Sequence, residues 1–186
     1  MIFNAHSRLE GKHAFLSPSN YHWINYSEDR LAERFSSSMA ARRGTELHDF
    51  AHEAIRLGIK LPVSESTLNM YVNDGIGYKM EVEQPLYYSD NCFGHADTLA
   101  FRQGFLRIHD LKTGVIPGSH HQLTVYAALF CLEYIVSPFE IDIELRIYQS
   151  DEVQTYSPFP ETITHLMDKI ILFDQKVNQL KEEGAW

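Results

Sequence analysis

The sequence has few cysteines, no long apolar run and no leader-like start. Its 186 residues include only two cysteines, Cys92 and Cys131. Both lie in apolar surroundings without the spacing of a metal site, so we expect buried thiols rather than a disulfide or a cluster. No apolar run approaches the ~20 residues of a membrane span, and the first residues show no basic-then-apolar signal. We therefore expect a cytoplasmic protein without a membrane segment.

Positive charge is also scarce. Lysine and arginine number 16 against 25 acidic residues, which gives a net charge of −9. Proteins dedicated to nucleic acid are usually basic, so this charge counts against DNA as a partner. It does not exclude DNA, because clustered carboxylates bind divalent cations that offset part of the charge. DNA contacts would then come from local patches such as Arg42-Arg43, or from an oligomeric channel.

The composition is that of an ordinary globular protein. Hydrophobic residues make up 44% of the chain and charged residues 22%, which does not match a disordered protein. A chain of this length fits one domain with a full-sized core. There are no internal repeats and no low-complexity linker. We predict a single domain over residues 1–186, with an N-terminal helical part of about residues 17–73.

Apolar spacing predicts four helices in the N-terminal part. Ser17, Thr45 and Ser64 are placed to cap the first, third and fourth of them. Gly44 is expected to separate the second helix from the third, and Gly58 to end the third. The expected helices cover residues 18–25, 28–42, 46–57 and 61–73, followed by a turn at 73–75.

Beyond this turn the period changes from helical to strand-like. Three strands joined by short turns form an antiparallel meander, with Pro85 at a strand end or bulge. A buried helix capped by Ser119 then crosses over to a further strand, which makes the sheet mixed, with helices on both faces. The fold class is therefore α/β. The expected strands cover residues 78–83, 92–102, 105–111, 140–149 and 153–156, and the expected helices 119–136 and 160–183.

Two aspartates and a lysine lie on adjacent strands of the meander. Asp97 falls within one apolar strand, and Asp110 ends the next, with Lys112 on the same face two residues later. A charge in an apolar strand is costly unless it is paired or bound to a metal. Asp110 and Lys112 can form a plain salt bridge. Alternatively, Asp97 and Asp110, with the Leu111 carbonyl, supply the oxygen ligands that Mg²⁺ prefers, and Lys112 orients a nucleophile beside a phosphate.

Four short motifs occur in a fixed order. They are G-x-x-x-H as Gly44-Thr45-x-x-His48, G-x-x-D ending at Asp97, D-x-K-T-G beginning at Asp110, and Q-x-x-x-Y from Gln122 to Tyr126. Together they resemble the PD-(D/E)xK nuclease superfamily in its RecB-like exonuclease branch. The resemblance covers about residues 17–144, and it implies a restriction-endonuclease-like fold.

The resemblance also implies a role for each matching residue. The metal would be Mg²⁺ or Mn²⁺, and Glu83 matches a position where an acid often lies near it. Neither His52 nor Glu53 is expected to be a ligand. Without the family, a lone helical histidine such as His48 is more often a satisfied core residue, and the helix that follows the loop would be an ordinary buried face. The implied site comprises the metal ligands His48, Asp97 and Asp110, the catalytic lysine Lys112, and the positioning residues Gln122 and Tyr126.

The sequence departs from the resemblance in one respect. Many RecB-like relatives hold an iron–sulfur cluster on four cysteines, the first just after the N-terminal helix. Here Tyr26-Ser27 occupy that neighbourhood, so we expect no cluster. There is also no Walker-type glycine loop, which indicates a stand-alone nuclease rather than part of a helicase. Small stand-alone members resemble bacteriophage recombination exonucleases, which form rings.

The sequence therefore predicts a Mg²⁺-dependent DNA exonuclease acting on DNA ends in recombination, repair or phage DNA metabolism. A bacterial cytoplasm, a phage origin, a homo-oligomer and a recombination or single-strand-binding partner protein are the corresponding expectations. One alternative is a structure-specific or site-specific endonuclease with the same site. Another is a non-cleaving DNA-binding module on a nuclease fold, which the retained Asp, Asp and Lys argue against.

Overall fold

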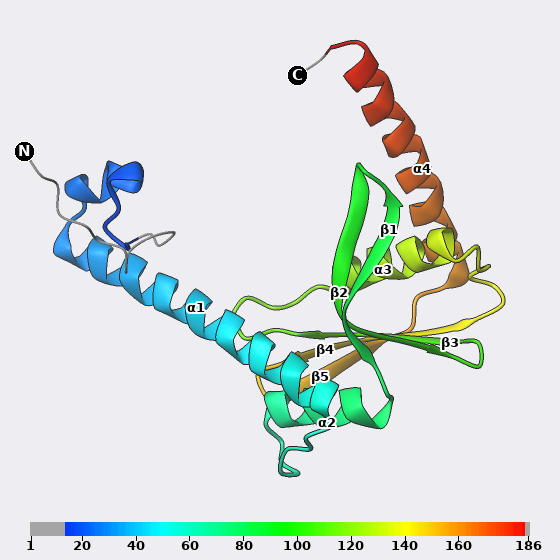
Figure 1. Ribbon diagram of the computed structural model, residues 1–186, viewed down its shortest axis with the longest axis horizontal. Coiled ribbons are helices and arrows are strands. Elements are labelled where there is room, and N and C mark those ends of the chain that lie inside the picture. Colours follow the sequence, from blue (N-terminus) through cyan, green and yellow to red (C-terminus); the bar gives the residue numbers. More distant parts are fainter. Residues whose placement is uncertain (1–13, 185–186) are drawn as a thin grey trace, which may run out of the picture. The chain divides into compact units, whose positions relative to one another are not determined.

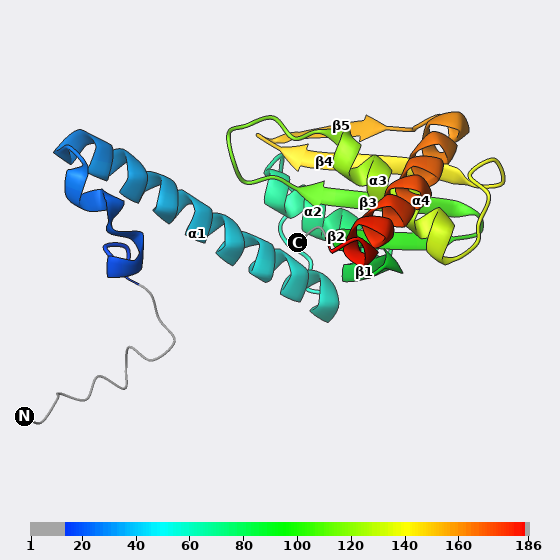
Figure 2. The ribbon, with the colours of Figure 1, turned by 90° about the horizontal axis from the view of Figure 1, so that it is seen from above.

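The structure is a computed structural model that describes residues 14–184 (Figures 1 and 2). The chain divides into two compact units, Met1–Arg43 and Gly44–Trp186. The first unit contains the 3₁₀ helix Pro18–Asn25 and the beginning of helix α1, Glu28–Leu57. Among the residues described, no helix is both long and apolar enough to cross a membrane.

The second unit is built on a five-stranded sheet whose strands lie side by side in chain order. β1, β2 and β3 pair antiparallel, β3 and β4 pair parallel, and β5 returns antiparallel. The parallel pair needs a crossover, which helix α3 provides. The α/β class, the mixed sheet and the meander are thus confirmed. The elements are α2 (Thr67–Gly77), β1 (Glu81–Ser89), β2 (Cys92–Arg102), β3 (Phe105–Leu111), α3 (His120–Glu133), β4 (Asp142–Gln149), β5 (Glu152–Tyr156) and α4 (Pro160–Glu182).

Helices cover both faces of this sheet, as predicted (Figure 2). On one face α3 and α4 pack against the strands through a fully buried cluster that includes Leu106, Leu123 and Ile163. On the other face α2 and the end of α1 pack through a second cluster around Tyr71 and Tyr148. Burial of these apolar side chains stabilises the fold and fixes the sheet between its two helical layers.

The cysteines and His109 belong to this interior. Cys131 is buried and Cys92 half-buried, and both are free thiols. His109 is fully buried, with Nδ1 3.2 Å from the Tyr148 hydroxyl oxygen. Burial, followed by the charge of Arg146, lowers the pKa of His109 to about 3. The ring is therefore neutral at physiological pH and acts as a packing residue, not a surface one.

Helix α1 corrects the predicted break at Gly44. The two expected helices are one continuous helix from Glu28 to Leu57, and Thr45 lies inside it rather than at a cap. A glycine inside a helix costs only ~1 kcal/mol relative to alanine, so it need not end the helix. Gly44 is buried, and a Cβ there would lie 2.7 Å from Thr113 Oγ1. The glycine therefore allows helix α1 to lie close to Thr113, and it does not form a turn.

Helix α2 also differs from the prediction. It begins at Thr67, later than the expected cap Ser64, and the predicted turn at 73–75 is helical. The Asn73 side chain accepts a hydrogen bond from the Leu61 amide at 2.9 Å and donates one to the Leu61 carbonyl at 3.0 Å. This turn-forming residue thus bonds to the preceding loop, not to its own backbone, which allows the helix to continue.

Three smaller predictions need correction. β1 runs through Pro85, because this strand lies at the sheet edge, where a missing amide is tolerated. Ser17 precedes the 3₁₀ helix without capping it, since its hydroxyl pairs with that of Ser19 at 2.7 Å. Helix α3 ends at Glu133, short of the predicted end at Val136.

Gly75 tests the packing of α2 against α1. A Cβ at Gly75 would lie 2.7 Å from Ile55 Cδ1 and 3.0 Å from its Cγ1. Overpacking costs about 1–3 kcal/mol and exceeds the ~1 kcal/mol that alanine gains inside a helix, so Gly75→Ala should lower the free energy of unfolding by up to about 2 kcal/mol. Gly77, on the same helix, has open space around its Cβ position, and Gly77→Ala should be neutral or stabilising. Urea unfolding of both variants measures this. Equal stability of the two would contradict the packing described.

Candidate active site

The two predicted carboxylates meet at the ends of β2 and β3. The register pairs Thr98 with His109, so the next residues along the strands, Asp97 and Asp110, come opposite each other. The Asp110 side chain is 4% exposed and that of Asp97 26%. Burial raises the pKa of both carboxyls, and the negative charge of Asp97 raises the pKa of Asp110 further. A cation at this point would relieve both effects.

Lys112 supplies the positive charge nearest to these acids. Its Nζ lies 2.8 Å from Asp110 Oδ2 and donates a hydrogen bond to Oδ1 at 3.0 Å. The same Nζ donates to Gln122 Oε1 at 3.3 Å, so the first turn of α3 helps to hold the lysine. The predicted Asp, Lys and Gln are thus brought together. A paired Asp110 and Lys112 fit both readings of the motif, the structural salt bridge and the catalytic pair.

His48 reaches the site from α1. Its Nδ1 lies 3.5 Å from Asp97 Oδ2, and the same oxygen accepts a hydrogen bond from the Leu111 amide at 3.3 Å. His48 lies one helical turn after Gly44, whose missing side chain lets α1 approach the chain at Thr113. The glycine and the histidine of the motif therefore act together. The Leu111 carbonyl as a metal ligand remains a prediction.

His52 was not expected to be a ligand, but it lies beside the candidate site. Ligand atoms of His48, His52 and Asp97 all lie within 4.8 Å of one another, the spacing of a metal-binding group. The His52 ring is buried, its Nε2 has no hydrogen-bond partner among the described residues, and burial lowers its pKa. Its spacing of four from His48, which puts both on one helix face, was the available signal. The exposed Glu53 lies on another face.

Glu83 lies on the β1 side of this group. Its carboxylate is 3.7 Å from His52 Nδ1 and 2.9 Å from Arg56 Nη2. The hydrogen bond from Arg56 is the main cause that lowers the pKa of Glu83. Glu83 also has a positive φ of 50°, which interrupts the pairing of β1 opposite Asp97. Its contacts orient His52, and its own role as a ligand remains a prediction.

Tyr126 contacts strand β2, whereas Gln122, on the same helix, contacts Lys112. A Cβ at Gly94 would lie 3.0 Å from Tyr126 Cε1 and 3.3 Å from its hydroxyl oxygen. The tyrosine ring therefore lies against the backbone of β2 at the first residue of the G-x-x-D motif. Tyr126 packs α3 on the strand that carries Asp97, while Gln122 contacts Lys112 directly.

Tyr71 is a second residue that sequence reasoning missed. It is fully buried, and its hydroxyl has no hydrogen-bond partner of good geometry among the described residues. Burial, followed by the charges of Asp97 and then Asp110, raises the pKa of Tyr71 well above its usual value. The hydroxyl therefore stays protonated, and the charges of both carboxylates act on it. In the sequence Tyr71 is one of several apolar residues of a helix, and nothing there distinguishes it.

The loop after Lys112 is held by one glutamine of β4. Gln149 Nε2 donates to the carbonyls of Gly114 at 2.6 Å and Ile116 at 2.8 Å, and its Oε1 accepts from the Gly118 amide at 2.8 Å. A Cβ at Gly118 would lie 3.1 Å from Lys112 Cγ, so this glycine leaves room for the lysine stem. Gln149 therefore positions both the lysine and the start of α3.

The comparisons with known proteins give no further guide. No family model matches the chain, and no curated protein and no solved structure matches it. The chemistry of the site therefore has to be argued from its own residues.

Gln149→Leu tests the loop support. It leaves two carbonyls and one amide of the loop without their partner. Because Gly114 and Ile116 are exposed, each lost hydrogen bond should cost only its net contribution of about 0.5–1.5 kcal/mol. The variant should unfold at lower urea and show faster amide exchange at residues 114–118. Gln154→Leu, at an exposed position of β5, is the matched control and should leave exchange in this loop unchanged. Unaltered exchange in Gln149→Leu would show that the loop does not depend on the glutamine.

Proposed function

We propose that this chain is a Mg²⁺- or Mn²⁺-dependent DNA nuclease that hydrolyses phosphodiester bonds. The observation that supports this most is the buried Asp110 paired with Lys112 at 2.8 Å, opposite an Asp97 that contacts His48. An ordinary structural ion pair consists of one acid and one base and needs no second carboxylate beside it. Here a second carboxylate lies opposite the pair and raises the pKa of the first, an arrangement that costs stability and is typical of functional sites.

The residues present fit a divalent cation. Asp97 and Asp110 offer carboxylate oxygens, which suit Mg²⁺ and Mn²⁺, while the imidazoles of His48 and His52 add donors that Mn²⁺ accepts more readily. His52 Nε2 is buried without a hydrogen-bond partner among the described residues, whereas Asp110 Oδ2 contacts Lys112 Nζ at 2.8 Å. When bound, such an ion lowers the pKa of a coordinated water and offsets charge on a phosphate.

The protein side chains have separate tasks in this proposal. The Lys112 ammonium, held by Asp110 and Gln122, presents positive charge to a phosphate oxygen or hydrogen-bonds the attacking water. The neutral Tyr71 hydroxyl is a buried donor whose pKa is raised by burial and by the charges of both carboxylates. Gln149 keeps the loop closed so that Lys112 does not have to be ordered during the reaction.

We favour an exonuclease that acts on DNA ends in the cytoplasm of a bacterial cell. With this activity we expect a phage origin, a homo-oligomer, and a recombination or single-strand-binding partner protein. A structure-specific or site-specific endonuclease would use the same residues and differ in the surface that holds DNA. Digestion of linear against closed circular DNA separates the two. A non-cleaving DNA-binding module would have no reason to retain Asp97, Asp110 and Lys112 together.

Lys112→Met should reduce cleavage of end-labelled DNA in Mg²⁺ by at least about a hundredfold, because the charge directed at the phosphate is lost. Chelator should abolish the wild-type activity. Lys60→Met, at an exposed position before α2, removes the same charge and should cut at the wild-type rate. Cleavage by Lys112→Met at the wild-type rate would overturn the nuclease assignment.

Asp110→Asn tests the cation directly, without DNA. Ligand binding to the folded state stabilises it by about 2.7 kcal/mol at a hundredfold excess over Kd, so Mn²⁺ should raise the melting temperature of the wild type. The same titration should leave Asp110→Asn unchanged, and Asp142→Asn, an exposed aspartate of β4, should respond like wild type. An equal rise in all three proteins would mean that the cation binds elsewhere.

A further inference from the structure

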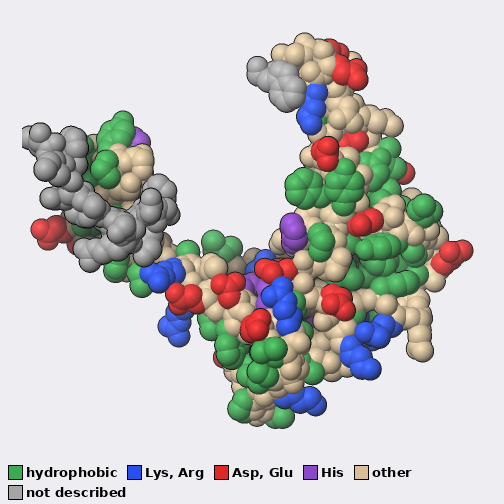
Figure 3. Space-filling model, in the orientation of Figure 1, with side chains coloured by type: hydrophobic (Ala, Val, Ile, Leu, Met, Phe, Trp, Pro, Cys, Tyr) green, Lys and Arg blue, Asp and Glu red, His purple; other side chains and the backbone are tan. Residues whose placement is uncertain are grey.

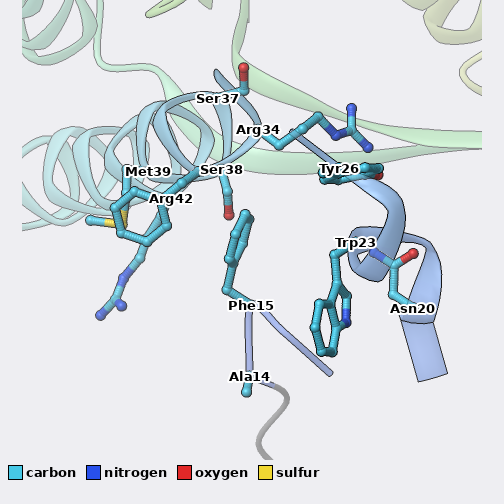
Figure 4. Close-up of a pocket in the computed structure, with 11 residues that line it drawn as sticks. Ala14, Phe15, Asn20, Trp23, Tyr26, Arg34, Ser37, Ser38, Met39 and Arg42 are labelled. Atoms are coloured by element: carbon cyan, nitrogen blue, oxygen red, sulfur yellow. The ribbon is translucent and has the colours of Figure 1, made fainter. Parts of the chain in front are cut away.

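The first unit contains a pocket that the catalytic proposal does not use. It measures about 710 Å³ and is lined only by residues of this unit, among them Phe15, Trp23, Tyr26, Arg34 and Arg42 (Figure 4). Figure 4 shows the three rings around one hollow, with Arg34 on the Tyr26 side and Arg42 on the Met39 side. No acidic side chain is among the residues that line it. The pocket thus combines aromatic faces with cations.

The rings of this pocket are held in place by the unit itself. The Trp23 indole N–H donates to the Ser17 carbonyl at 3.1 Å. Phe15 contacts Phe35 edge to face, with ring centroids 5.2 Å apart. A ligand that stacks here therefore has less side-chain entropy to remove on binding.

One face of Tyr26 is also covered by the chain. The Arg30 guanidinium lies 4.6 Å from the centroid of the Tyr26 ring. Phe15 remains 37% exposed and Phe35 49% exposed. Exposed aromatic surface bordered by polar side chains marks a binding site more often than a scattered surface residue does.

Charge identifies the class of ligand. The whole chain carries −9, yet residues 34–43 contain three arginines and no acid. No ion pair joins Arg34 to another residue of the described chain. On the face of the second unit seen in Figure 3, basic side chains are interspersed with acidic ones. The pocket lining therefore carries two arginines and no acid in a chain that is acidic as a whole.

We propose that this pocket binds single-stranded DNA, with unpaired bases stacked on Trp23, Phe15 and Tyr26 and the phosphates near Arg34 and Arg42. Aromatic faces with flanking cations are the means by which proteins hold single strands without reading sequence. A duplex cannot use the rings, because its bases are already stacked. The proposal rests on the proposed function in one respect, since it takes DNA to be the polymer on which the chain acts.

The test measures binding in chelator, where cleavage does not interfere. A labelled oligothymidine of about 12 nucleotides is titrated with the full chain and followed by fluorescence anisotropy. Trp23→Ala should weaken binding about tenfold, the effect of losing one base–aromatic stack. Trp23→Phe keeps a ring and should bind within about threefold of wild type. Ile24→Ala, exposed beside Trp23 and outside the pocket, should bind like wild type.

Two further comparisons separate stacking from charge. An abasic strand of equal length keeps every phosphate and should bind about tenfold more weakly than oligothymidine. Arg34→Ala should reduce affinity and the salt dependence of binding more than Arg43→Ala, which removes the same charge outside the pocket lining. In a Trp186→Phe background Trp23 is the remaining tryptophan, and the strand should quench its fluorescence.

Failure of this proposal is distinguishable from failure of the nuclease assignment. Cleavage without pocket-dependent binding would overturn the pocket alone, whereas pocket-dependent binding without Mg²⁺-dependent cleavage would leave the pocket and remove the nuclease. Equal affinity for duplex and single strand, or for abasic and thymidine strands, would overturn the pocket proposal. So would a change of oligomeric state in Trp23→Ala with unchanged DNA binding, because the pocket would then be a contact between copies of the chain.

Discussion

The contact between the Lys112 ammonium and the Asp110 carboxylate, at 2.8 Å, joins a lysine side chain that is 32% exposed to a carboxylate that is only 4% exposed. Removing a carboxylate from water is expensive, and attraction to an ammonium offsets this only with good geometry and further hydrogen bonds. The Gln122 side chain accepts one such hydrogen bond from the lysine. Gly118 leaves room for the lysine stem, and its amide is bound by Gln149. The local chain between β3 and α3 thus supports this one pair.

The second carboxylate makes the arrangement harder to explain as a structural feature. Asp97 lies opposite Asp110 and raises its pKa, so the folded chain keeps two like charges close together. The nearby His48 compensates in part, and His52 is held neutral by burial. A cation bound at such a site would stabilise the folded state, which links the stability of the fold to the proposed chemistry.

The acidic character of the chain is distributed unevenly. Asp97, Asp110 and Glu83 belong to the second unit, whereas the aromatic pocket and its arginines belong to the first. A single net charge of −9 therefore describes neither unit well. Local composition decides which surface attracts a polyanion, because surface charges separated by more than about 10 Å are largely screened in salt.

Much of the fold and the centre of the site followed from the sequence alone. Strand alternation and turn residues determined the meander, and a spacing of two along β3 put Asp110 and Lys112 together, because these patterns depend on near neighbours. Tertiary packing decided the rest. Gly44 and Asn73 read locally as a break and a turn, but both lie inside helices since their partners, Thr113 and Leu61, lie far along the chain or across a loop. His52 was signalled by its spacing of four from His48 on one helix, whereas Tyr71 and Gln149 lie on other segments that only folding brings together, and no local pattern records such contacts.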